Sequence, residues 1–203
     1  MEIACPRAAN SVGNRGFTLT ELVIVCTVAL FLMAIATPEF LKISYNIRLR
    51  NAATNIAALM QQARITSARK NAVYTIYYPT TGGNACIDLN NNGSCDAGEP
   101  VVAFSSTITQ AAAAPTGGPG QPSAYVLVGD TGTTVYTNGT TLGFSNRGLP
   151  CAYSSGTCAT PAAGYFVFYL TDSRPGGNSG WAAIVVSRSG RSKALLWNGS
   201  SWS

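Results

Sequence analysis

Side chains that carry oxygen ligands recur at regular spacing in one short stretch of the sequence, residues 86–99. Counted from the first of them, positions 1, 3, 5, 7, 9 and 12 are Asp88, Asn90, Asn92, Ser94 (through its backbone carbonyl), Asp96 and Glu99. Gly93 stands at position 6, where a calcium loop turns sharply so that alternate side chains converge on the ion. No helical pattern flanks the stretch, so a turn rich in Asn, Asp and Gly between two strands is the alternative. The sequence leaves both interpretations open, a Ca²⁺ site and a structural turn.

A second chemically suggestive group is basic and lies near the C-terminus. Arg188, Arg191 and Lys193 fall within six residues of one another, in a segment that predicts a β-hairpin turning at Ser189-Gly190. Cations on such a turn suit contacts to phosphates that are independent of base sequence and weaken steeply with salt. The hairpin is therefore a candidate DNA site, and a basic turn that is merely solvated is the alternative.

Several classes of catalytic and cofactor site are excluded by composition. The chain has no histidine among its 203 residues, which rules out Ser-His-Asp and Cys-His catalysis and His-ligated zinc. It also lacks a Cys-x-x-Cys pair and a phosphate-binding Gly-rich motif that ends in Lys-Ser/Thr. We therefore expect a protein that is not an enzyme and requires no cofactor.

The cysteines divide into two groups by position. Cys5 precedes, and Cys26 lies within, a long apolar stretch, where a small thiol is expected to pack like an apolar residue. Four others, Cys86, Cys95, Cys151 and Cys158, fall in a polar region typical of an oxidising compartment. Four cysteines allow three connectivities. Close spacing favours Cys86–Cys95 and Cys151–Cys158, each worth roughly 2–3 kcal/mol on the chain-entropy model.

The longest apolar stretch of the sequence follows Gly16 and is the candidate membrane segment. From Leu22 to Ala36 it has no charge, and with its flanks it reaches the roughly 20 residues of a membrane-spanning helix. One carboxylate, Glu21, stands near its start, where an ionisable group is costly in lipid and so indicates a function. A short basic leader (residues 1–15) precedes it. Because positively charged flanks stay on the cytoplasmic side of a membrane, we expect the leader to lie in the cytoplasm. The small residue typical of a cleavage site, Gly16, comes before the apolar core, unlike in a secretory signal peptide.

The string Gly16-Phe-Thr-Leu-Thr-Glu21 followed by an apolar helix resembles the signature of type IV pilins. The resemblance implies that a prepilin peptidase cleaves between Gly16 and Phe17 and methylates the new N-terminus at Phe17. It also implies that Glu21 and the helix proline Pro38 serve assembly with other pilins or pseudopilins. The segment 143–148 (GFSNRG) and the C-terminal hairpin are similar to the FimT/GspH family of minor pilins and pseudopilins. Some FimT members bind DNA through Gly-Arg-x-Arg, whose last place here is Lys193.

The fold class expected from these elements is α+β: a long, partly transmembrane N-terminal helix packed on an antiparallel β-sheet domain, as in pilins. An apolar stripe that includes Leu49, Ile56 and Ala63 predicts that the helix continues to about Asn71, roughly 80 Å in all. The expected parts are a cleaved leader (1–16), a membrane and assembly helix (17–38), the outer half of the helix (39–72) and a β-rich periplasmic domain (73–203).

Strands are expected where β-branched and aromatic residues alternate between turn residues. The predicted strands are 73–78, 101–104, 125–128, 133–136, 141–144, 165–170, 182–186 and 194–197. Residues 110–122 are predicted to be a flexible connector, and the loop from Cys151 to Cys158 and residues 175–180 are predicted surface excursions.

The function expected from the resemblance is assembly: a minor pilin of the inner membrane that enters or primes a type IV pilus, with DNA binding and uptake as an added role. The alternative is a GspH-like minor pseudopilin of a type II secretion system, which uses the same physical interactions with different partners.

Overall fold

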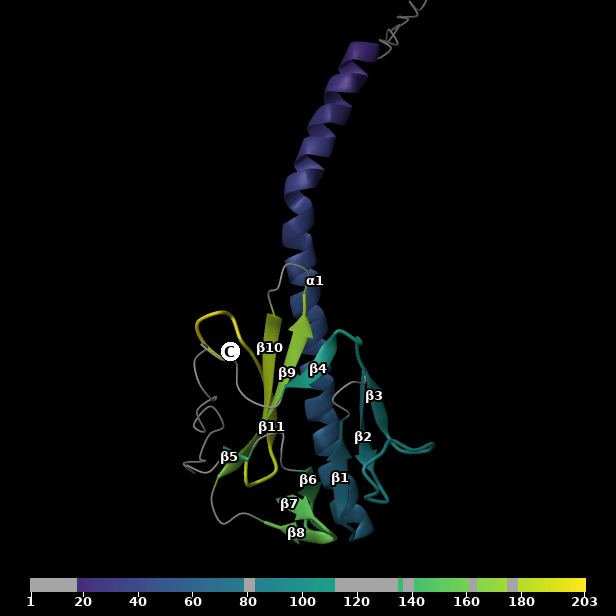
Figure 1. The fold of residues 1–203 in the computed structure, drawn as a ribbon, viewed down its shortest axis with the longest axis vertical. Coiled ribbons are helices and arrows are strands. Elements are labelled where there is room, and N and C mark those ends of the chain that lie inside the picture. The colour runs from purple at the N-terminus through teal and green to yellow at the C-terminus, as the bar shows by residue number, and fades with distance from the viewer. Residues whose placement is uncertain (1–17, 79–82, 112–134, 137–140, 161–163, 175–178) are drawn as a thin grey trace, which may run out of the picture. The chain divides into compact units, whose positions relative to one another are not determined.

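The computed structural model describes residues 18–78, 83–111, 135–136, 141–160, 164–174 and 179–203. It has an α+β architecture in which one long helix is followed by two β-sheets (Figure 1). The elements are α1 (Leu19–Lys70), β1 (Tyr74–Tyr77), β2 (Asn84–Asp88), β3 (Val101–Ala103), β4 (Ile108–Ala111), β5 (Val135–Tyr136), β6 (Thr141–Phe144), β7 (Pro150–Ser154), β8 (Thr157–Ala159), β9 (Tyr165–Ser173), β10 (Ser179–Val186) and β11 (Ser192–Leu196). The expected fold class is confirmed.

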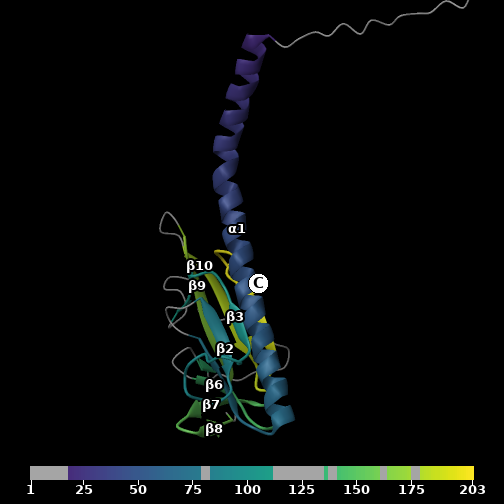
Figure 2. The same cartoon turned by 90° about the vertical axis from the view of Figure 1, so that its right-hand side faces the viewer.

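The chain divides into two compact units, Met1–Lys42 and Ile43–Ser203. In the first unit, the described part of α1 presents its large apolar side chains to the outside. In the second unit, the rest of α1 packs with both sheets, which lie along it in Figure 2. The stripe predicted from the sequence is the buried face here, since Leu49, Ile56 and Ala63 are each at most 1 % exposed.

The end of α1 follows from the residues placed there. Asn71 adopts the left-handed conformation with φ of 52°, and the N–H of Ala72 donates to the carbonyl of Ser67 at 3.2 Å. This is the capping pattern in which asparagine or glycine closes the last turn. Arg69 and Lys70 in that turn favour the negative end of the helix dipole. The predicted end near Asn71 is therefore confirmed.

The two sheets have distinct orders. The six-stranded sheet has the order β3-β2-β1-β6-β7-β8, and the other has β11-β10-β9-β4 with β5 paired to β9. Their inner faces, together with α1, form one core that includes Ile76, Phe144 and Phe168. A smaller cluster on the other face of the second sheet includes Val167, Tyr169 and Val185.

Several strand predictions need correction. The predicted connector 110–122 begins inside β4, because Gln110 and Ala111 pair with Leu170 and Tyr169 despite their connector-like composition. The predicted excursion between Cys151 and Cys158 is the β7–β8 hairpin, in which Tyr153 pairs with Cys158. Strand β2 is absent from the predicted set, because its sequence (NACID) has no run of β-branched residues.

One pairing departs from the antiparallel pattern. β5 pairs with β9 in parallel, which requires a long crossover, and the crossover here includes β6, β7 and β8 of the other sheet. The predicted strand 125–128, most of the connector and residues 133–134 lie outside the described residues, as do residues 175–178 of the predicted excursion.

Candidate functional site

The start of α1 is organised by the residues of the signature. Thr18 precedes the first helical residue, and its Oγ1 accepts a hydrogen bond from the backbone N–H of Glu21 at 3.2 Å. Thr18-Leu-Thr-Glu21 thus has the spacing of a capping box, which begins a helix sharply. The Glu21 side chain is exposed on the first turn. Gly16 and Phe17, the predicted cleavage and methylation positions, lie outside the described residues.

The following turns of α1 expose an unbroken apolar surface. Leu22, Leu30 and Phe31 are 59–70 % exposed, and no residue of the most apolar 18-residue window is buried. The free thiol of Cys26 is exposed on the same segment. By length and composition α1 is able to cross a membrane. Pro38 lies inside the helix, where it cannot donate a backbone hydrogen bond.

A comparison with known families matches the N-terminal segment. Residues 12–37 match the prokaryotic N-terminal methylation motif. The chain is pilin-like. The motif and the apolar helix together fit anchoring in a membrane and assembly with other pilins after processing by a prepilin peptidase. No curated protein and no solved structure matches the chain.

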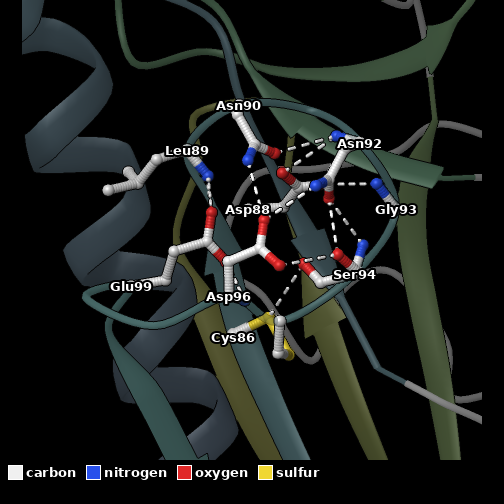
Figure 3. The surroundings of a disulfide bond; sticks show 10 residues. Cys86, Asp88, Leu89, Asn90, Asn92, Gly93, Ser94, Asp96 and Glu99 are labelled. Atoms are coloured by element: carbon white, nitrogen blue, oxygen red, sulfur yellow. Dashed lines mark hydrogen bonds between the residues drawn. A yellow bond between two sulfur atoms is a disulfide. The ribbon is translucent and has the colours of Figure 1, made fainter.

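In this pilin-like chain, the segment that predicted a calcium loop is a closed turn between β2 and β3. Disulfide Cys86–Cys95 joins its base, with Cα atoms 5.7 Å apart (Figure 3). Asp88 accepts hydrogen bonds from the backbone N–H groups of Asn92 and Gly93, and Glu99 accepts from those of Leu89 and Asp96. The loop is therefore ordered by its own donors and the disulfide.

Asp96 shows how tightly this loop is bonded. Its carboxylate accepts from the side-chain amides of Asn90 and Asn92 at 2.8 and 2.7 Å and from the Ser94 hydroxyl at 3.1 Å. These hydrogen bonds, that from Asn90 first, lower the pKa of the Asp96 carboxyl because they stabilise its charged form. Within the described part of the chain, no three or more His, Cys, Asp or Glu side chains are grouped to hold a metal ion.

The basic hairpin is present where the sequence predicted it. β10 and β11 form an antiparallel pair in which Ala182 lies opposite Leu196 and Val186 lies opposite Ser192. Residues 187–191 form the turn between the two strands. Arg188 and Arg191 are exposed in this turn, and Lys193 is exposed at the start of β11. Gly190 in the turn has φ of 80°, which favours glycine. The hairpin also contacts α1, since the Gln61 amide donates to the Gly190 carbonyl at 2.8 Å and to Ser192 Oγ at 2.9 Å.

The segment 143–148 and the C-terminal hairpin, far apart in sequence, meet at Arg64 of α1. A Cβ on Gly148 would lie 3.3 Å from Arg64 Cγ, and a Cβ on Gly190 would lie 2.9 Å from Arg64 Nε and 3.1 Å from the Gly148 carbonyl oxygen. Arg147, next to Gly148, is exposed. The structure therefore brings Arg64 and Arg147 to the basic turn, neither of which was a predicted site residue.

A buried ionic cluster was also missed. Asp172 is 1 % exposed, accepts a hydrogen bond from Thr107 Oγ1 at 2.8 Å, and lies 3.5 Å from Arg174 Nε. Arg174 in turn donates to Asn46 Oδ1 at 2.9 Å and lies over the Tyr45 ring at 5.8 Å. The cluster ties the end of β9 to the first turns of α1 in the second unit. The only signal in the sequence is the spacing Asp-Ser-Arg, which puts both charges on one side of an extended chain.

Proposed function

We propose that the chain is a minor pilin that is processed at the inner membrane and assembles into, or primes, a type IV pilus. The observation that carries the proposal is the match to the methylation motif over a helix whose large apolar side chains are exposed. Nothing in the described chain covers these side chains, and burial of such surface is worth about 25 cal/mol per Å². Before assembly, lipid surrounds these apolar side chains. After assembly, the helices of other subunits surround them.

The proposed roles follow from position along this helix. The peptidase cleaves between Gly16 and Phe17, and the methylated amine of Phe17 pairs with Glu21 of a neighbouring subunit. Such pairing offsets the cost of burying both charges in an apolar bundle. Pro38 interrupts the backbone hydrogen bonds and so gives the helix a place to adapt on assembly. The β-rich unit then lies in the periplasm, opposite the basic leader.

Two substitutions test this proposal. Gly16→Val should leave a precursor that retains its leader, measured as the intact mass of the membrane protein. Glu21→Ala should be cleaved normally and yet be absent from sheared filaments. Glu39→Ala is the matched control, because Glu39 is an exposed carboxylate of the same helix whose partner, Lys42, lies in its own chain at 2.7 Å. Normal cleavage of Gly16→Val, or normal filament entry by Glu21→Ala, would contradict the proposal.

A GspH-like pseudopilin of type II secretion remains the alternative, since processing and helix burial are the same in both systems. The partners distinguish them. Co-purification with pilins of a surface filament supports the first, and co-purification with pseudopilins of a secretion system supports the second.

The basic turn favours DNA as a second ligand. Arg147, Arg188, Arg191 and Lys193 are exposed on two segments that contact each other through Gly148 and Gly190. With so few charges we expect weak binding to phosphates, made useful by several copies in one filament. Lys193 replaces the last arginine of the FimT pattern, which keeps the charge and loses bidentate hydrogen bonding.

The test of DNA binding is a mobility shift with the full chain in detergent, at two salt concentrations. Arg188→Ala/Arg191→Ala should reduce the shift at low salt, whereas Lys42→Ala/Arg48→Ala, which removes the same charge from α1, should not. Equal retardation by both double variants, or none by the wild type, would remove the turn as a DNA site.

A further inference from the structure

A cavity of about 520 Å³ lies on the outer face of the six-stranded sheet, and its described lining residues include none from α1 or from the basic turn. Its size falls within the range of pockets that bind small molecules. Strands β1, β6 and β7 contribute Thr75, Tyr77, Thr141 and Tyr153 to its lining. Further lining residues come from the loop that follows β2 and from the turn between β7 and β8.

The strand register explains why these side chains meet. Residues directly opposite in an antiparallel pair share a face of the sheet. Thr75 lies opposite Asp88 and Gly143, and Thr141 lies opposite Tyr153, so that Thr75, Tyr77, Thr141, Tyr153 and Asp88 share one face. The other face is apolar and belongs to the core with α1, as Ile76, Ile87 and Leu142 show. The cavity therefore lies over a sheet whose reverse side is rigidly packed.

The two disulfides fix opposite sides of this cavity. Cys86–Cys95 closes the loop that supplies Asp88, Asn91 and Asn92, and Figure 3 shows Asp88 and Asn92 in this loop. Cys151–Cys158 joins β7 and β8 across the turn that supplies Ser154 and Ser155. Cys86, Cys151 and Cys158 also lie on the outer face of the sheet, as the pairs Tyr77–Cys86, Gly143–Cys151 and Tyr153–Cys158 require. Both cross-links thus preform the same cavity, which lowers the entropic cost of binding.

The lining has the chemistry of a site for a neutral, hydroxyl-rich ligand. Its described residues include Tyr77 and Tyr153, three side-chain amides and several hydroxyls, and they include neither lysine nor arginine. Its single carboxylate among these residues, Asp88, is 1 % exposed and accepts backbone N–H groups with both oxygens. An anionic ligand would meet no counter-charge there, and a cation would meet a carboxylate whose oxygens already accept hydrogen bonds.

Two polar atoms of the lining have no hydrogen-bond partner among the described residues, Tyr78 Oη and Asn91 Oδ1. Both are buried, and burial raises the pKa of the Tyr78 phenol well above its ordinary value, so that it remains a neutral donor. A buried polar atom without a partner costs free energy. Neither atom is exposed to the cavity, and the Tyr78 ring packs against Phe168 on the core face of the sheet. The ligand class therefore follows from the other side chains that line the cavity.

We propose that this cavity is a carbohydrate-binding site, selective for neutral sugars and preformed by the two disulfides. The proposal is independent of the assembly role of the helix. Its ligand class rests on the uncharged, tyrosine- and amide-rich lining.

The test is frontal affinity chromatography on the immobilised full chain in a polyoxyethylene detergent, because alkyl glycoside detergents would compete for the site. The probes are maltose, lactose and di-N-acetylchitobiose, with 3′-sialyllactose as the anionic comparison. We expect at least one neutral disaccharide to be retained. Tyr153→Ala should weaken its association about tenfold or more, and Thr141→Val, which removes an exposed hydroxyl with little change of shape, should weaken it several-fold.

Tyr45→Ala is the matched control, because Tyr45 lies on α1 and does not line the cavity. An unfolding midpoint close to that of the wild type in every variant, measured by circular dichroism, separates loss of binding from loss of fold. Retention of none of the neutral sugars, retention of sialyllactose alone, or equal retention by wild type, Tyr153→Ala and Thr141→Val would overturn the proposal.

Discussion

The two units of the chain differ in where their apolar side chains go. In the described part of Met1–Lys42, large apolar residues such as Leu19 and Phe31 are 80 % and 70 % exposed. In Ile43–Ser203, residues of the same kind, such as Ile56 and Phe144, are fully buried. One helix, α1, contributes to both units. The same helix therefore serves two purposes: in the second unit it contributes a buried face to the core, and in the first unit its large apolar side chains stay exposed.

The largest expected effect is on the free energy of unfolding, when a large apolar side chain is truncated in one unit and then in the other. Phe144→Ala should lower the free energy of unfolding by about 3–5 kcal/mol, because it removes a buried aromatic ring and leaves a cavity. Leu30→Ala, at a position 66 % exposed, should leave that free energy nearly unchanged. Denaturant titration of the full chain in detergent measures both. A loss of similar size from the two variants would mean that the units do not differ in this way.

The next effect concerns the ionic cluster of the second unit. Arg174→Ala should cost about 3 kcal/mol, because it leaves the Asp172 carboxylate buried without its cation. Arg147→Ala, which removes an exposed arginine, should cost little, and both are measured by the same titration. If Arg174→Ala unfolds with wild-type stability, the cluster does not hold β9 to α1.

Reduction of the disulfides should have a somewhat smaller effect, and only on the second unit. Each closes a short loop, with sequence separations of 9 and 7, for which about 2–3 kcal/mol is expected. Cys86→Ser/Cys95→Ser and Cys151→Ser/Cys158→Ser should therefore each lower the unfolding midpoint, whereas Cys26→Ser, at a free thiol, should not. A midpoint shift in Cys26→Ser alone would contradict the account.

The smallest effect is the pH dependence of the Asp88–Glu99 loop. The pKa of Asp96 is lowered from 3.8 in the folded loop, so its contribution to stability is present above about pH 4 and is lost as pH falls through the lowered pKa. An NMR titration of the Asp96 carboxyl should show this lowered value. Asn90→Ala/Asn92→Ala should return it toward 3.8, and an unchanged value in that variant would show that these amides are not the cause.

We infer that the same loop is held by its own hydrogen bonds rather than by calcium. The carboxylate oxygens of Asp88, Asp96 and Glu99 all accept hydrogen bonds from the loop itself, so the loop needs no ion to hold these side chains in place. Calorimetric titration at millimolar Ca²⁺ should therefore give no heat and no shift in unfolding temperature. A saturable heat, absent from Asp88→Asn, would assign the loop to calcium instead.

Local signals were the part of the fold that the sequence made predictable. The stripe through Leu49 and Ile56, the asparagine cap at Asn71 and the glycine turn at Gly190 each act within a few residues. β4 was not predictable, because Gln110 and Ala111 form a strand through pairing with β9 and have no strand-like composition. The closely spaced cysteines pointed to the two local pairs that the structure contains.

The candidate sites likewise divide into those with a local sequence signal and those that depend on the packed fold. Glu21 is visible in the sequence, because a single carboxylate at the start of an apolar stretch needs no tertiary structure to be noticed. The cavity over β1, β6 and β7 depends on strand register, which places Thr141 opposite Tyr153 and cannot be derived from either segment alone. The meeting of Gly148 and Gly190 at Arg64 likewise requires the packed fold.

The central claim, that this pilin-like chain is processed and assembled through its first unit, is tested most directly by mass analysis of its N-terminus in sheared filaments. The account predicts a peptide that begins at N-methylated Phe17, with no peptide from residues 1–16. A filament-associated chain that still begins at Met1, or that is cleaved after the apolar helix, would contradict it.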